Sequence, residues 1–126
     1  MGKSRILVVD DDREIIAILK SELAKEGYEV LASSEGKEAL EMIKAEKPHL
    51  IILDIVLPGM DGYEILDRLK KDDETEKIPV IMLTDMGLDE DIKKGINMGA
   101  QHYLTKPLRT RMLIRCIEST LNQGAL

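Results

Sequence analysis

Apolar residues follow two alternating patterns along the chain. Continuous apolar runs, of which ILVV at 6–9 is the first, are typical of strands that are buried on both faces. Similar runs occupy 50–53 and 80–83, and a shorter one occupies 103–104. A weaker alternating segment at 28–32 predicts a strand with only one well-buried face.

Between these runs, apolar residues recur at every third or fourth position, which is the spacing of one face of a helix. The spacing predicts helices at 13–26, 35–46, 63–71, 88–97 and 108–122. Each predicted helix carries apolar residues that we expect to face a core. In chain order these residues are Ile15, Ile16, Ile18, Leu19 and Leu23; Ala39, Leu40, Met42 and Ile43; Ile65, Leu66 and Leu69; Ile92 and Ile96; and Met112, Leu113, Cys116, Ile117 and Leu121.

Strand and helix alternate five times, which predicts a parallel sheet with helices on both of its faces. The continuous apolar runs agree, because a strand of a parallel sheet is covered on both sides. The alternating second strand fits an edge of the sheet. We therefore predict an α/β fold over residues 1–126, with one doubly wound, flavodoxin-like sheet of five parallel strands in the order 2-1-3-4-5.

Composition narrows the class of protein. The 126 residues suffice for one domain, and aromatic residues make up only 2%, so the core must be aliphatic. A formal net charge of -6 argues against direct binding of nucleic acid. The single cysteine, Cys116, permits no disulfide within the chain and fits a small buried hydrophobic residue in a reducing, cytoplasmic location. No apolar stretch approaches the roughly 20 residues of a membrane span, so we expect no membrane association.

Polar residues that could bind a ligand or take part in a reaction follow four of the predicted strands. Asp10 and Asp11 end the first strand, Asp54 ends the third, Thr84 ends the fourth, and Lys106 follows the fifth. In a doubly wound sheet, ligands bind beyond the carboxyl ends of the strands, at the point where the strand order reverses. In the order 2-1-3-4-5 this point lies between the first and third strands, so these side chains are expected to converge there.

The chemistry of this set can be inferred from its residue types. Three crowded carboxylates do not stay ionised easily without a cation, and their oxygens suit a hard divalent ion, Mg²⁺ or Mn²⁺. Such an ion usually takes one or two protein carboxylates, which leaves the third free to attack phosphorus and form an aspartyl phosphate. The Thr84 hydroxyl and the Lys106 ammonium group would hold the remaining phosphoryl oxygens.

Each of these residues also has a simpler explanation. The acids at 10–12 could favour the N-terminus of a helix, and for Asp12 we prefer the role of helix cap. Asp54 could form a turn, Thr84 could cap the next helix, and Lys106 could be a solvated charge. Their joint occurrence at one edge of the sheet favours a functional site.

These residues resemble the receiver domain of bacterial response regulators, the phosphorylated component of two-component signalling. The resemblance extends over nearly the whole chain, from RILVVDDD through LIILDIVLPGMDGYEIL and IPVIMLTD to GAQHYLTKP. Its most specific part is the segment after the third strand, in which Asp54 is followed by Pro58, Gly59, Asp61 and Gly62.

The resemblance implies a role for each position of the acidic site. Asp54 would be the phosphorylated residue. Asp11 would be the direct carboxylate ligand of magnesium, whereas Asp10 would act mainly through a metal-bound water. Val56 would give its backbone carbonyl to the metal, so the identity of its side chain matters little for ligation.

The resemblance also implies a switch. Thr84 would move towards the phosphoryl group, Tyr103 would swing inwards with it, and Lys106 would pair with the phosphoryl oxygens. The peptide bond between Lys106 and Pro107 would be cis. Asp85 departs from the family, which usually has Ala or Gly after the switch threonine. Asp85 could cover the phosphoryl site, repel an incoming anion, or point harmlessly into solvent.

The leading hypothesis is a phosphorylation switch. A histidine kinase or a histidine phosphotransfer protein would phosphorylate Asp54, and the face formed by the fourth helix, fifth strand and fifth helix would change and be recognised by a downstream effector. The protein would be a monomer or a phosphorylation-dependent dimer. It would not be an enzyme beyond its own phosphorylation and autodephosphorylation.

Two other functions fit parts of the sequence. The first is a small phosphatase of the haloacid-dehalogenase type, in which Asp10 is the nucleophile and Asp12 the acid. The second is a docking module that retains the site but has lost the chemistry, and Asp85 is the only residue in its favour. The residue that becomes phosphorylated distinguishes the switch from the phosphatase.

Overall fold

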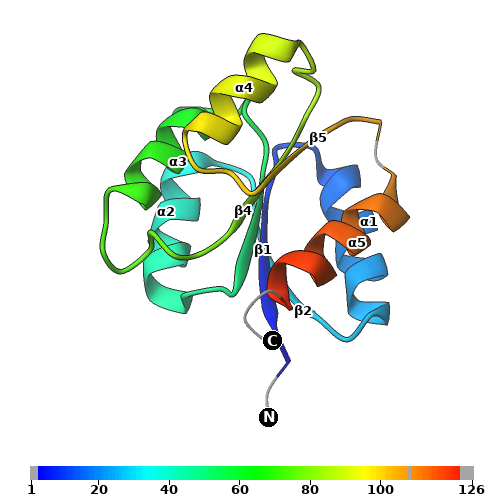
Figure 1. Cartoon of the computed structure of the whole chain (residues 1–126). Helices are drawn as coiled ribbons and strands as arrows, with labels where there is room; N and C mark the ends of the chain where they lie inside the picture. Colours follow the sequence, from blue (N-terminus) through cyan, green and yellow to red (C-terminus); the bar gives the residue numbers. More distant parts are fainter. Residues whose placement is uncertain (1–2, 108, 123–126) are drawn as a thin grey trace.

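The structure, a computed structural model, describes residues 3–107 and 109–122. Strands and helices alternate strictly in this part of the chain (Figure 1). The strands are β1 (Arg5–Val9), β2 (Glu29–Ser33), β3 (Leu50–Leu53), β4 (Val80–Thr84) and β5 (His102–Thr105). The helices are α1 (Arg13–Lys25), α2 (Gly36–Glu46), α3 (Gly62–Lys70), α4 (Asp89–Asn97) and α5 (Thr110–Leu121).

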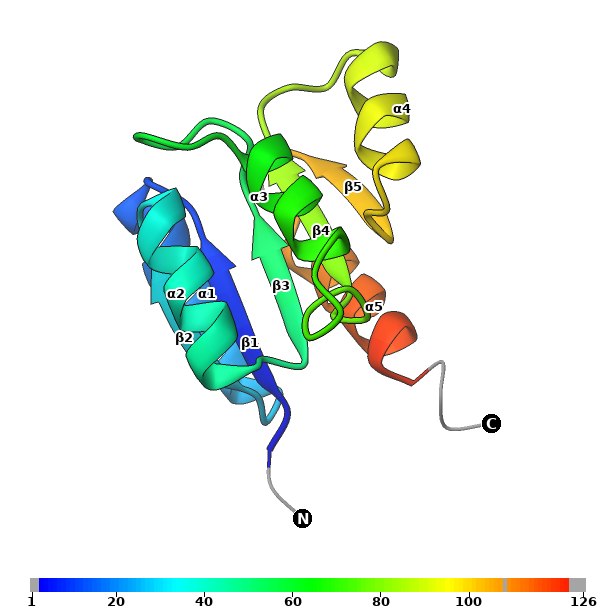
Figure 2. The ribbon, with the colours of Figure 1, turned by 90° about the vertical axis from the view of Figure 1, so that its left-hand side faces the viewer.

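The strands form one parallel sheet in the order β2-β1-β3-β4-β5, which confirms the predicted fold and topology. Helices α2, α3 and α4 lie on one side of the sheet, and α1 and α5 lie on the other (Figures 1 and 2). Strand β2, predicted at an edge from its alternating pattern, is an edge strand. None of the helices within the described residues has the length and apolar character that crossing a membrane requires.

Successive residues of each central strand supply two separate cores. In β1, Leu7 and Val9 pack under α2 and α3, whereas Ile6 and Val8 pack under α1 and α5. This follows from the strand geometry, in which neighbouring side chains point to opposite faces of the sheet. The continuous apolar runs of the sequence are therefore explained by burial on both faces.

Aspartates cap the helices that follow β1 and β3. The Asp12 carboxylate accepts hydrogen bonds from the backbone N–H groups of Glu14 and Ile15, which confirms its expected role as the cap of α1. Asp61 caps α3 in the same way, accepting from the Glu64 N–H group. Both caps fix the position of a helix that begins beside the acidic edge of the sheet.

Three apolar residues that were expected to face a core are exposed instead. Ile18, Ile96 and Met112 keep 44%, 43% and 48% of their surface in contact with solvent. Each lies at the margin of its helix's apolar face, and the helix buries the neighbouring positions. In α4 the neighbour is Gly95, the only buried residue of that helix.

The predicted element ends agree with the structure to within a few residues. The last helix was expected from Leu108, which lies outside the described residues, and α5 begins at Thr110. Cys116 is half-buried against the core between the sheet and α1 and α5, and its burial raises the pKa of the thiol. This environment agrees with the expected role of a small hydrophobic residue.

Candidate functional site

The register of the sheet brings Asp10 and Asp54 together although they are far apart in the sequence. Val9 pairs with Leu53 at the carboxyl ends of β1 and β3, so the next residue of each strand lies at the same edge. The Asp54 N–H group donates a hydrogen bond of 2.9 Å to the Val9 carbonyl, which extends the pairing by one step. Parallel strands thus place the two carboxylates side by side.

Three carboxylates form the centre of the site. Asp10, Asp11 and Asp54 each offer an oxygen atom, and these atoms lie within 4.8 Å of one another. Asp10 and Asp54 keep only 2% and 5% of their surface exposed, whereas Asp11 is exposed. The expected cluster is therefore present, with two buried members and one that faces solvent.

Lys106 bridges the two buried carboxylates. Its Nζ lies 3.0 Å from Oδ2 of Asp10 and 3.0 Å from Oδ2 of Asp54. Burial disfavours the charged ammonium group, but the hydrogen bonds to both carboxylates outweigh this cost and raise the pKa of Lys106. Burial also raises the pKa of Asp10, against the opposing effect of the Asp12 N–H group and of Lys106.

The turn after β5 positions this lysine. The Lys106–Pro107 peptide bond is cis, which is the geometry that the resemblance implies. The Lys106 N–H group donates a hydrogen bond of 2.9 Å to the Thr84 carbonyl, so the backbone at the end of β5 stays attached to β4. The ammonium group thereby reaches the acidic cluster from the far side of β4.

Thr84 and Tyr103 both interact with Met86, in the loop between β4 and α4. Thr84 is fully buried, and its Oγ1 accepts a hydrogen bond of 3.4 Å from the Met86 N–H group. The Tyr103 hydroxyl donates to the Met86 carbonyl. Asp85, between Thr84 and Met86 in the chain, is exposed.

The loop after β3 presents Asp54 through backbone contacts. Oδ1 of Asp54 accepts hydrogen bonds from the N–H groups of Ile55, at 2.6 Å, and Val56, at 3.4 Å. The start of α3 approaches this loop so closely that a Cβ atom on Gly62 would lie 2.3 Å from the Asp54 carbonyl oxygen. Only glycine fits there without moving the backbone that holds the carboxylate.

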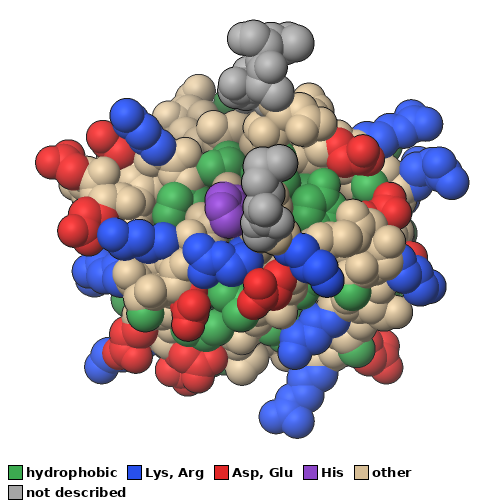
Figure 3. Space-filling model, turned by 90° about the horizontal axis from the view of Figure 1, so that it is seen from below, with side chains coloured by type: hydrophobic (Ala, Val, Ile, Leu, Met, Phe, Trp, Pro, Cys, Tyr) green, Lys and Arg blue, Asp and Glu red, His purple; other side chains and the backbone are tan. Residues whose placement is uncertain are grey.

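Among the described residues, the clustering of negative charge at the acidic edge is not found at the end of the molecule where the strands begin. Figure 3 shows the end of the molecule at which the strands begin, opposite the acidic edge, where Lys and Arg side chains are interspersed with Asp and Glu. Mixed charges of this kind are typical of a solvated surface. At the acidic edge, by contrast, three carboxylates converge around one lysine.

Comparison with known proteins identifies the family. The response regulator receiver domain family model matches residues 6–118. The chain belongs to the response regulator receiver domains. It is a phosphoacceptor domain of two-component signal transduction, and the phosphatase alternative is not favoured.

Solved structures of receiver domains resemble this one closely. A CheY-like receiver domain protein from Methanospirillum hungatei is 35% identical, with a TM-score of 0.91 over 98% of each chain. A protein from Chloroflexus aurantiacus described as a response regulator is 34% identical, with a TM-score of 0.92 over 97% of this chain and all of the other. The BeF₃-activated receiver domain of RstA from Klebsiella pneumoniae is 31% identical, with a TM-score of 0.88 over 95% of this chain and all of the other.

The carboxylates of this receiver domain fit a hard divalent cation. Two are buried with a single ammonium group between them, so the three negative charges are only partly compensated. Oxygen ligands from carboxylates are those that Mg²⁺ prefers. The Val56 backbone lies at the same edge, because the Val56 N–H group is hydrogen-bonded to Asp54.

The receiver domain's Asp12 does not suit the role that a phosphatase would require. In that hypothesis Asp12 is the acid beside an Asp10 nucleophile. The Asp12 carboxylate instead accepts two hydrogen bonds from the first turn of α1. Its position is explained by helix capping, and Asp10 is engaged by the Asp12 N–H group and by Lys106.

Sequence reasoning missed two residues beside the switch. Tyr63 of α3 and Gly95 of α4 surround Tyr103 in the structure, and neither was assigned a role. One signal was available for Tyr63, because the chain contains only three tyrosines and neither phenylalanine nor tryptophan. An aromatic residue in so aliphatic a chain is a signal of a specific packing role.

Proposed function

We propose that Asp54 is the phosphorylated residue of this receiver domain. One observation carries the proposal: the Asp54 carboxylate is held at the carboxyl edge of the sheet between backbone N–H groups on one oxygen and the Lys106 ammonium group on the other. These contacts orient the carboxylate for attack, and the ammonium group is placed where negative charge on phosphoryl oxygens needs compensation.

The transfer step would proceed by attack of an Asp54 oxygen on phosphorus. A new bond joins this oxygen to phosphorus, while the bond from phosphorus to the donor breaks and its electron pair leaves with the donor. The donor would be the protonated phosphohistidine of a histidine kinase or of a histidine phosphotransfer protein, and neutral imidazole is the leaving group. Hydrolysis of the resulting aspartyl phosphate would return the carboxylate.

Asp10, Asp11, Asp54 and the Val56 carbonyl would hold the divalent cation, Mg²⁺ or Mn²⁺. Their oxygens and their excess negative charge support this assignment. When bound, the cation supplies positive charge that compensates the transferring phosphoryl group. Lys106 supplies a second positive charge from the protein itself, 3.0 Å from two of the carboxylates.

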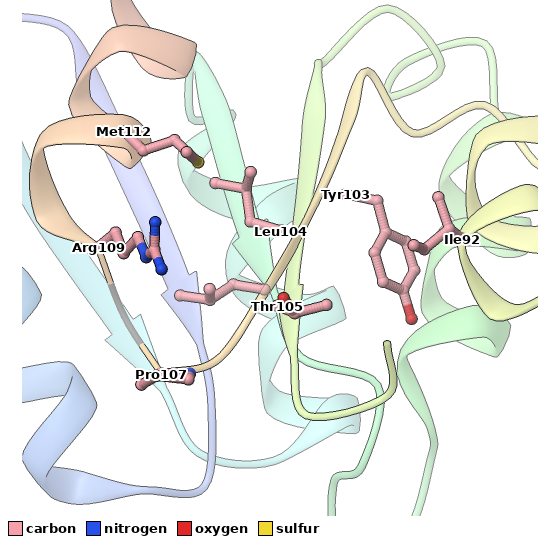
Figure 4. A pocket seen from close by; sticks show the side chains of 8 residues that line it. Ile92, Tyr103, Leu104, Thr105, Pro107, Arg109 and Met112 are labelled. Atoms are coloured by element: carbon pink, nitrogen blue, oxygen red, sulfur yellow. The ribbon is translucent and has the colours of Figure 1, made fainter. Parts of the chain in front are cut away.

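Thr84 and Tyr103 would convert phosphorylation into a change of surface. Their shared contact with Met86 supports this role, since a movement of Thr84 towards a phosphoryl oxygen displaces the loop that also binds Tyr103. Behind Tyr103 lies a groove of about 340 Å³ between α4, β5 and α5 (Figure 4). It is lined by Leu83, Ile92, Tyr103, Leu104, Thr105, Pro107, Arg109 and Met112, and we propose it as part of the effector surface.

We further propose the partners, location, oligomeric state and self-catalysis that are typical of the family. The partners are a histidine kinase or phosphotransfer protein and an effector protein, without direct contact to nucleic acid. The domain acts in the cytoplasm, as a single domain over residues 1–126, and is a monomer or a dimer that forms on phosphorylation. Its only catalysis is of its own phosphorylation and autodephosphorylation.

Intact-mass measurement tests the proposal. The protein is incubated with acetyl phosphate, with and without Mg²⁺, and compared with the Asp54→Asn and Asp10→Asn variants. A Mg²⁺-dependent phosphoryl adduct that disappears in Asp54→Asn, and forms more slowly in Asp10→Asn, is the expected result. An adduct that persists in Asp54→Asn and requires Asp10 would support the phosphatase, and no adduct with any donor would support the docking module.

A further inference from the structure

Helix α4 is only thinly attached to the rest of the molecule. Gly95 is its one buried residue, and the apolar residues Leu88 and Ile96, at its start and near its end, are 64% and 43% exposed. A glycine contributes almost no apolar surface, so burial of side chains does not by itself hold this helix in place. Two tyrosines supply specific contacts to it in addition to the half-buried Ile92.

The first tyrosine is Tyr103 of β5, which lies against the backbone of α4. A Cβ atom on Gly95 would come within 2.8 Å of Cδ2 and 3.0 Å of Cε2 of the Tyr103 ring. Figure 4 shows the ring pointing away from the Leu104 side of the strand and towards Ile92 of α4. The missing side chain of Gly95 therefore makes the slot that the ring occupies.

The second tyrosine is Tyr63 of α3, which is 8% exposed. Its hydroxyl donates a hydrogen bond of 3.3 Å to the Asp91 carbonyl in the first turn of α4. The Lys94 ammonium group lies over its ring, 4.1 Å from the centroid, in a cation–π contact. Tyr63 thus contacts α4 through both its ring and its hydroxyl.

The two tyrosines also influence each other's pKa. Burial raises the pKa of Tyr103 most, and the neighbouring Tyr63 hydroxyl raises it further. Two of the three aromatic residues in the chain therefore lie beside one helix. The Tyr103 hydroxyl remains hydrogen-bonded to Met86, in the loop that also contacts Thr84.

We propose that Tyr63 is a positioning residue that fastens α4 to Tyr103, so that the helix and the ring change position together. The Tyr63 hydroxyl binds the Asp91 carbonyl, and the Tyr63 ring lies under Lys94. The Tyr103 ring lies against Gly95 of the same helix, and its hydroxyl binds the loop that contacts Thr84. The proposal rests on the proposed function only for the event that drives the movement. The fastening itself is a property of the unphosphorylated protein.

Tyr63→Phe tests the fastening in the unphosphorylated protein, because it keeps the ring and its burial but removes the hydroxyl. Amide hydrogen exchange of α4 is expected to accelerate roughly fivefold, the range that follows from losing one hydrogen bond to a locally opening helix. The amide exchange rates of β1 and β3, corrected for any change in global stability, should stay unchanged. Tyr28→Phe is the matched control, because Tyr28 packs against the core on the other face of the sheet.

Gly95→Ala gives a second test with an unambiguous sign. Alanine has a higher helix propensity than glycine. Amide exchange in α4 should therefore slow if the Tyr103 ring does not need the space beside Gly95. If the Tyr103 ring occupies the slot as described, the added methyl group displaces the ring, and α4 exchange accelerates instead. Slower exchange in Gly95→Ala, or unchanged exchange in Tyr63→Phe, would overturn the proposal.

The coupling to the acidic site is tested with Mg²⁺ and beryllofluoride, an analogue of the phosphoryl group. In NMR spectra of the parent protein, amides beside Asp54 and amides of α4 are both expected to shift. In Tyr63→Phe the shifts beside Asp54 should remain while those of α4 fall by at least half. A full α4 response in Tyr63→Phe would contradict the coupling, whereas no response beside Asp54 in the parent would contradict the proposed function and leave the exchange result to decide on the fastening.

Discussion

Nζ of Lys106 lies 3.0 Å from Oδ2 of Asp54, across 52 residues of sequence and one intervening strand. The same nitrogen lies 3.0 Å from Oδ2 of Asp10, so one positive charge is shared by two buried negative ones. Breaking a buried ion pair by removing one partner is costly, because the other partner keeps its desolvation penalty. The stability of the unphosphorylated domain should therefore depend on this lysine.

Lys106→Met is expected to lower the free energy of unfolding by about 3 kcal/mol in the absence of divalent cations. Added Mg²⁺ should restore part of this loss, since a bound cation compensates the same carboxylates. Urea denaturation with EDTA or with Mg²⁺ measures both effects. Lys71→Met is the control: Lys71 pairs with Asp67 on the surface at 3.0 Å, and its loss should cost less than about 1 kcal/mol. Equal losses in the two variants would contradict this account.

Asp10 should give the unfolding free energy a specific dependence on pH. Burial raises the pKa of Asp10 in the folded state above its ordinary value of 3.8, so the folded protein binds this proton more tightly than the unfolded chain does. Stability contributed by this group therefore falls as the pH rises from 3.8 through the folded-state pKa. The raised pKa of Lys106 has no effect in this range, because its contribution is present below the ordinary value of 10.5 and is lost only above it.

Asp10→Asn removes this dependence and is the variant that measures it. With EDTA present, its unfolding free energy relative to the parent is expected to increase as the pH rises above 3.8, and then to become constant. Urea denaturation at a series of pH values gives the difference directly. A difference that is the same at every pH, or that shrinks as the pH rises, would show that burial does not dominate at Asp10.

The close approach at Gly62 predicts a large effect of a small substitution. In Gly62→Ala the new Cβ would meet the Asp54 carbonyl oxygen at 2.3 Å and the Ile55 Cα at 2.8 Å, so the backbone must move. We expect a loss of about 3 kcal/mol in unfolding free energy and weaker Mg²⁺ binding by the displaced Asp54. Gly27→Ala is the control, because Gly27 has a positive φ, which strains alanine, but no atom lies within 4 Å of its Cβ position. Its cost should be about 1 kcal/mol, with unchanged Mg²⁺ affinity.

Asp85 is exposed next to the buried Thr84, at the position where the family usually has a small residue. Its negative charge should slow the approach of an anionic donor, so Asp85→Ala is expected to accelerate phosphorylation by acetyl phosphate and loss of the phosphoryl group by roughly two- to fivefold. Asp85→Asn separates charge from size, and added salt should reduce a charge effect. Identical rates for Asp85→Ala and the parent in both directions would assign Asp85 to the solvent-facing role.

The acidic site was predictable from the sequence for a physical reason. Parallel strands all end at one edge of the sheet, so a polar residue that directly follows a buried apolar run has little freedom of position. Asp10 and Asp54 are such residues, and the register of β1 and β3 brings them together as expected. The Asp12 cap was equally predictable, because capping depends only on local sequence.

The surroundings of Tyr103 were not predictable in the same way. Which margin of an apolar helix face becomes buried depends on how the helix lies on the sheet, and this tertiary packing left Ile18, Ile96 and Met112 exposed. The contact between Tyr63 and α4 likewise joins two helices whose relative position the sequence pattern does not specify. The sequence pattern also assigned no role to Gly95, whose missing side chain accommodates the Tyr103 ring.

The central claim is that Asp54 carries the phosphoryl group, and chemical trapping of the phosphorylated residue tests it most directly. After incubation with acetyl phosphate and Mg²⁺, borohydride reduces an aspartyl phosphate to homoserine, which peptide mass spectrometry locates in the sequence. We predict homoserine at position 54 and unmodified aspartate at positions 10 and 11. Homoserine at position 10 with intact Asp54 would contradict the claim.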